Sequence, residues 1–163
     1  MLNERFCVSF WLDGNNHSIS AHREQLFVNE LTITLKDHIN SVAIGKDMIL
    51  LTTEKRDENG TLSKEQPKNN IFSYDFNGNF LWNIEDIMEK DYMDHPQTFY
   101  RVAYHTTDSL LEYVSPTIWN YDNFKRQVSS NPDHEYIVCH TICAVRYIFD
   151  ITDGSIINHM QNC

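Results

Sequence analysis

Short runs of β-branched and aromatic residues, separated by turn-forming residues, recur along most of the chain. Residues 5–12 and 26–35 alternate apolar and polar side chains, and residues 41–53 hold two further apolar runs. A period of two places alternate side chains on opposite faces of a strand, so that one face can be buried. Asn77 and Gly78, between two more such runs, are a strong hairpin signal. The pattern predicts a mainly antiparallel, all-β fold.

The rest of the chain continues this pattern with one exception. Residues 98–104 and 110–114 are predicted to pair as strands, residues 136–149 are strand-like throughout, and a last strand follows Gly154. Two polar stretches, residues 54–70 and 120–135, are predicted to be irregular. The exception is residues 84–93, whose apolar side chains at positions 84, 87, 88 and 92 follow helical spacing. We therefore expect one short helix in an otherwise β protein.

Two of the predicted hairpins share a pattern. Residues 74–82 and 149–157 each contain an aromatic residue, an aspartate, an apolar residue, a turn with glycine and two further apolar residues. Each follows a predicted strand pair, and the resulting four-strand unit resembles a β-propeller blade over residues 39–84 and 98–158. Since two blades cannot close a ring, the resemblance implies a partial propeller or a sandwich-like stack of twisted four-stranded sheets. Residues 1–163 are then a single β-rich domain. The alternative is that the two hairpins are unrelated.

The net charge limits the possible partners. The chain carries 23 Asp and Glu residues against 13 Lys and Arg residues, a net charge of −10. Nucleic acids and anionic membranes both attract basic surfaces, so neither is an expected partner. A cationic protein is favoured instead. The N-terminal residues show no secretory signal and no apolar run approaches 18 residues, so we expect a cytoplasmic protein.

No catalytic or metal-binding motif is present in the sequence. On one strand, Cys139 and Cys143 would share a face about 13 Å apart, too far for a disulfide, and His140 would point to the opposite face. Asp75 and Asp150 lie beside turns, where aspartate commonly accepts backbone N–H groups. We expect no catalytic residues, no cofactor and no metal.

The densest charge lies within the predicted helix and directly after it. Five acidic residues fall within ten positions, opposed only by Lys90: Glu85, Asp86, Glu89, Asp91 and Asp94. On a helix, Glu85 and Glu89 would share one face, where like charges cost a few tenths of a kcal/mol. A basic partner would offset that cost. The alternative is a solvated face that aids solubility.

A second candidate binding feature lies in the irregular stretch. Trp119 and Tyr121 lie outside the strand pattern, and tryptophan and tyrosine are enriched in interface hot spots. The other aromatic residues fall mainly at strand spacing and are expected to fill the core. Trp119 and Tyr121 are therefore candidate partner-binding residues, together with the acidic segment.

A small, acidic, asparagine-rich β protein without a catalytic motif is similar to bacterial immunity proteins, including those of contact-dependent growth inhibition. The resemblance implies a cytosolic inhibitor that forms a heterodimer with a basic toxin domain, such as a nuclease, and blocks its cationic cleft. Two alternatives remain: a docking domain that joins a larger assembly by strand addition, and a small hydrolase with an Asp/His site.

Overall fold

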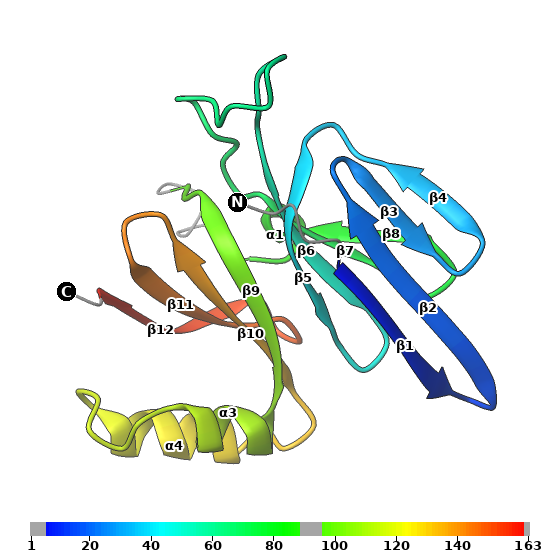
Figure 1. Ribbon diagram of the computed structural model, residues 1–163. Helices are drawn as coiled ribbons and strands as arrows, with labels where there is room; N and C mark the ends of the chain where they lie inside the picture. Colours follow the sequence, from blue (N-terminus) through cyan, green and yellow to red (C-terminus); the bar gives the residue numbers. More distant parts are fainter. Residues whose placement is uncertain (1–5, 89–95, 162–163) are drawn as a thin grey trace.

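The computed structural model describes residues 6–88 and 96–161 and contains three antiparallel four-stranded sheets (Figure 1). The first sheet has the order β1 (Phe6–Leu12), β2 (Asn15–His22), β3 (Gln25–Val28), β4 (Leu31–Thr34). The second has the order β5 (His38–Ile44), β6 (Ile49–Glu54), β7 (Ile71–Tyr74), β8 (Phe80–Asn83). The third has the order β12 (Ser155–Gln161), β11 (Val145–Asp150), β10 (Glu135–Thr141), β9 (Phe99–Thr106).

The predicted all-β stack of four-stranded sheets is confirmed, and within the described ranges the sheets do not close into a barrel. The sequence pattern indicated two such units and missed the first sheet. Residues 26–35 are not one strand, because β3 and β4 form a hairpin there. Asn29 allows this turn: it adopts a positive φ of 55°, and its side-chain oxygen accepts the Ser18 N–H.

The sheets and helices form successive layers, and β6 lies at the centre. Leu50 packs in a cluster with Phe99, Ile137 and Phe149 of the third sheet. Its neighbour Leu51 packs on the opposite side, against residues of the first sheet. Both faces of β6 are therefore buried, which explains the apolar run at residues 49–51.

The prediction of a single helix is wrong. The described residues include α1 (Ile84–Ile87), α3 (Thr107–Tyr113) and α4 (Tyr121–Ser129). Residues 110–114, predicted as a strand, belong to α3 and its C-cap, and the stretch 120–135 contains α4. Thr106 and Ser109 form a capping box that starts α3.

α3 and α4 each have an apolar face made by residues four positions apart. Leu110 and Val114 of the α3 segment, with Phe124 and Val128 of α4, pack on the third sheet. α3 and α4 thus form an outer layer (Figure 1). Among the residues that the structure describes, no helix is both long enough and apolar enough to cross a membrane.

The cysteines do not lie as predicted. Cys139 is a buried core residue, but Cys143 is exposed in the turn between β10 and β11. Residues 136–149 form a hairpin and not one strand. Ala144, which has a positive φ, lies in the turn that reverses the chain. Both cysteines, and the exposed Cys7, are free.

Two close contacts hold the layers in place. Asn70, which is 1% exposed, joins the second sheet to the third: it donates to the carbonyl oxygens of Thr53 and Phe99 and accepts the Phe99 N–H at 2.7 Å. Gly154, in the turn between β11 and β12, lies directly against the carbonyl oxygen of Ile87 at the end of α1.

Candidate functional site

The beginning of the acidic segment is organised by helix capping. Asn83 is the N-cap of α1, and the Asp86 carboxylate accepts the Asn83 backbone N–H at 2.8 Å. Glu85 is exposed and accepts a hydrogen bond from the Asn69 side chain at 2.8 Å. Asp86 therefore has a structural role, whereas the Glu85 side chain remains accessible.

The helix is shorter than predicted. Met88 is the C-cap of α1 with extended backbone angles, and its side chain is buried in the core. α1 therefore ends at Ile87 and does not continue to residue 93, as the sequence pattern had predicted. Glu89, Asp91 and Asp94 lie outside the described residues.

Trp119 lies in the loop between α3 and α4 and is 87% exposed. The next residue, Asn120, has left-handed backbone angles and precedes the first turn of α4. Beside them is a pocket of about 210 Å³, lined also by Asn123, Gln127 and Asn158. Asn158 Oδ1 is buried there and has no hydrogen-bond partner among the residues that the structure describes. The loop thus presents a large aromatic side chain next to polar amide groups.

Tyr121 differs from Trp119. It is half-buried, packs at the edge of the helical layer, and its ring lies 6.3 Å from that of Phe124. The structure also separates the two candidate regions: Figure 1 shows α1 beside the second sheet and the α3–α4 loop at the left end of the helical layer. α1, which carries Glu85, and the α3–α4 loop, which carries Trp119, therefore lie in different parts of the fold.

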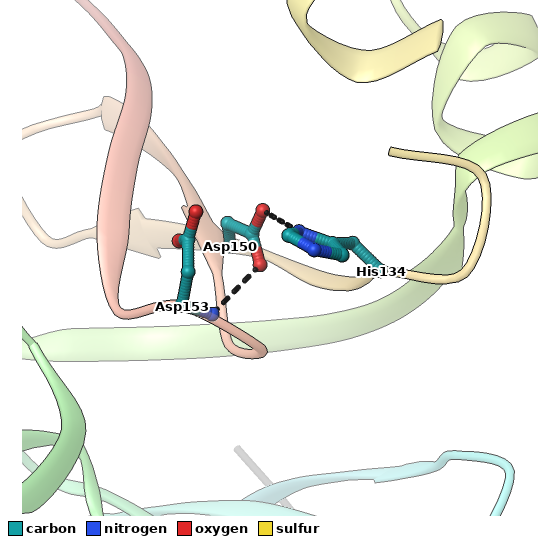
Figure 2. A group of neighbouring side chains, drawn as sticks. All are labelled: His134, Asp150 and Asp153. Atoms are coloured by element: carbon teal, nitrogen blue, oxygen red, sulfur yellow. Dashed lines mark hydrogen bonds and ion pairs between the residues drawn. The ribbon is translucent and has the colours of Figure 1, made fainter. Parts of the chain in front are cut away.

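A third cluster was not found by the sequence analysis. His134, Asp150 and Asp153 come together from the turn before β10 and the turn after β11 (Figure 2). His134 Nδ1 lies 2.6 Å from Asp150 Oδ2, and the Asp150 side chain is 1% exposed. Asp150 Oδ1 accepts the backbone N–H groups of Thr152 and Asp153.

Several acceptors of this cluster already take part in hydrogen bonds within the two turns. Asp153 accepts both the N–H and the hydroxyl of Ser155, at 2.9 and 2.7 Å. A metal ion bound between the three side chains would compete with the His134–Asp150 contact. The arrangement is therefore a clamp between two turns, and the predicted turn-forming role of Asp150 is confirmed. Asp75 is confirmed in the same role, since it accepts the N–H groups of Asn77 and Asn79.

The clamp makes stability depend on pH. The hydrogen bond to Asp150 raises the pKa of His134, against the opposing effect of burial, and the charges of Asp150, Asp153 and Asp133 act in the same direction as that bond. Because the pKa of His134 is higher in the folded state, the interaction of the protonated imidazole stabilises the fold. This contribution is fully present below the unfolded-state pKa of about 6.5, and it is lost as the pH rises through the folded-state pKa.

We expect His134→Ala to lower the free energy of unfolding by about 1 kcal/mol more at about pH 5.5 than at about pH 9. Urea unfolding at the two pH values measures this difference. His22→Ala, at an exposed position on β2, is the control. An equal loss at both pH values for His134→Ala would contradict the prediction.

The geometry defines a layered antiparallel β protein with candidate binding surfaces on exposed loops. The family described as "Domain of unknown function (DUF7957)" matches residues 16–112. Because this match covers more than half of the 163 residues, the chain belongs to that family. The matched span includes Glu85 and Asp86 and ends within α3, before Trp119 and His134. No curated protein matches the chain.

Proposed function

We propose that this chain is a non-catalytic binding protein that neutralises a basic toxin domain, such as a nuclease, in the manner of an immunity protein. The observation that carries the proposal is the 87% exposure of Trp119 beside a polar pocket. An exposed tryptophan leaves a large apolar surface in water, and burying it against a partner is a common source of interface hot-spot energy.

The charge supports a basic partner. The net charge of −10 attracts cationic proteins from a distance and raises association rates. Residues 85–94 contribute five acidic side chains and one basic side chain to this charge. The proposed complex is a heterodimer in which acidic groups lie against the cationic cleft of the toxin.

The proposed compartment is the cytoplasm. Cys7 and Cys143 are exposed and free. Exposed thiols persist where the surroundings are reducing, and small secreted domains more often pair their cysteines. This supports a protein that meets its toxin inside the cell.

The proposal expects a toxin domain encoded by a neighbouring gene. The test is whether this chain protects growth when that domain is expressed with it, together with the measured affinity of the pair. We expect Trp119→Ala to weaken binding by about 30-fold, because truncating a hot-spot tryptophan costs about 2 kcal/mol. Trp11→Ala is the matched control, since Trp11 is 75% exposed on β1. Equal affinities for Trp119→Ala and the wild type would remove Trp119 from the interface, and failure to protect growth would overturn the function.

A further variant tests electrostatic attraction in the same assay. Glu85→Lys reverses an accessible charge and leaves the capping residue Asp86 in place. If the acidic segment faces the toxin, this variant associates more slowly at low salt, and the difference fades as salt screens the charges. Equal rates at low salt would assign the segment to a solvated face.

One observation favours a second function, docking by strand addition. β1 is at the edge of the first sheet, and in the described part of the chain it pairs only with β2. Its sequence, FCVSFWL, contains none of the charged residues or prolines that usually protect an edge strand. A docking domain would leave growth in the presence of the toxin unchanged, so the protection assay separates the two functions.

A further inference from the structure

Three basic side chains lie in one row across the third sheet. Arg101 of β9 and Arg146 of β11 are each directly opposite His140 of β10. Directly opposite residues share a face of the sheet, with Cβ atoms about 4.5–5.5 Å apart. Like charges at directly opposite positions destabilise a sheet. The row is also unusual because the chain as a whole has a net charge of −10.

A β-bulge shapes one end of this row. Thr141 pairs with Phe99 and His140 with Arg101, so Tyr100 is an extra residue in β9. The Tyr100 ring lies 6.4 Å from the His140 ring, and the Arg101 guanidinium carbon lies 5.9 Å from the Tyr100 ring. Bulges re-aim side chains and are enriched next to functional sites.

The bulge is anchored to the neighbouring sheet. The Tyr100 carbonyl oxygen accepts a hydrogen bond from the Asn40 side chain of β5 at 2.7 Å. The extra residue is therefore held by a specific contact across the layers. Asn40 fixes the backbone that carries both Tyr100 and Arg101.

The other end of the row is held by an aromatic residue of α3. The Arg146 guanidinium carbon lies 5.7 Å from the Tyr113 ring, which in turn lies 5.0 Å from the His105 ring. Tyr100 and Tyr113 are 40% and 43% exposed. Each arginine is thus positioned by a partly exposed aromatic ring, with the half-buried His140 between them.

The electrostatics of the row favour a negative ligand. Burial, Arg101 and Arg146 all lower the pKa of His140, and among the described residues no carboxylate acts in the opposite direction. His140 Nδ1 is buried without a hydrogen-bond partner in the described structure. Within the same residues, Arg101 makes no ion pair with an acidic side chain. A bound anion would relieve the repulsion within the row.

We propose that Arg101, His140 and Arg146 bind a phosphate group, either as free phosphate or on a nucleoside monophosphate. Guanidinium groups present planar pairs of donors that match phosphate oxygens. Tyr100 and Tyr113, which are 40% and 43% exposed, are aromatic side chains against which a base could stack. This site is independent of the proposed toxin partner and involves neither Trp119 nor Glu85.

The test is an NMR titration of the full chain with inorganic phosphate and, separately, with adenosine monophosphate. Ionic strength is held constant with sodium chloride, and the imidazole signals of His140 are followed. We expect saturable shifts with both probes. Tighter binding of the nucleotide would identify a base as part of the ligand, whereas equal binding would identify phosphate alone.

Two variants with the same charge change make the test specific. Arg101→Gln should weaken phosphate binding at least about tenfold, since hydrogen bonds to charged groups are worth about 1.5–3 kcal/mol. Arg126→Gln, at an exposed position on α4, should bind as the wild type does. Cooperative thermal unfolding, with melting temperatures no lower than that of the wild type, would show that both variants fold.

Non-saturable shifts, shifts reproduced by chloride, or equal affinities for the wild type and Arg101→Gln would overturn the proposal. Arg101→Lys adds a geometric check. It retains the charge but loses the paired donors, so it should bind phosphate less tightly than the wild type and more tightly than Arg101→Gln.

Discussion

Gly154→Ala should lower the free energy of unfolding by about 3 kcal/mol. Gly154 has a φ of +83°, which costs a residue with a Cβ about 1–2 kcal/mol. An added Cβ would also overlap the Ile87 carbonyl oxygen, and this backbone atom cannot move away as a flexible side chain could. Overpacking of this kind adds about 1–3 kcal/mol. Urea unfolding monitored by circular dichroism measures the loss.

Gly14→Ala separates the two contributions. Gly14 has a similar φ of +77°, but a Cβ placed there meets no atom of the described residues within 4 Å. This variant should lose only the conformational contribution of about 1–2 kcal/mol. Equal losses for the two variants would show that the overlap of the added Cβ with α1 contributes nothing to the loss for Gly154→Ala.

Asn70→Ala should have an effect of similar size. The substitution leaves the Phe99 N–H and the carbonyl oxygens of Thr53 and Phe99 without the bonds that Asn70 supplies in the interior. Each buried polar group that loses its partner costs about 1–3 kcal/mol. We expect a loss of about 3 kcal/mol or more in urea unfolding.

Asn77→Ala is the matched control for Asn70. Asn77 is exposed in the turn between β7 and β8, so its truncation should change stability by less than about 0.5 kcal/mol. A small loss for Asn70→Ala would mean that water replaces its hydrogen bonds, and the junction of the second and third sheets would then be hydrated.

Local signals predicted the hairpins, since turn chemistry and alternation act within a few residues. The Asn77–Gly78 turn formed as predicted, with Gly78 at a φ of +84°. Residues 110–114 show where this approach fails: a short apolar run suits either a strand or a helix. The capping box of Thr106 and Ser109, followed by Leu110 and Val114 at helical spacing, is the signal that was available.

The candidate sites depend more strongly on tertiary structure. Trp119 is exposed in a loop that the sequence marked as irregular, but the end of α1 packs against the turn at Gly154, which is distant in sequence. The pairing of His134 with Asp150 joins two turns 16 residues apart. The row formed by Arg101, His140 and Arg146 depends on the register of three strands and on a β-bulge. Neither the register nor the bulge can be predicted from the periodicity of the sequence.

The burial of β6 on both faces has a consequence for synthesis on the ribosome. Each sheet is built from one contiguous segment, so the first two sheets can pair their strands as soon as they leave the exit tunnel. Leu50 then remains uncovered until Phe99, Ile137 and Phe149 have also emerged. At the usual rates of translation this interval lasts several seconds. The nascent chain therefore presents an apolar sheet surface during that time, and we expect chaperones to bind it there.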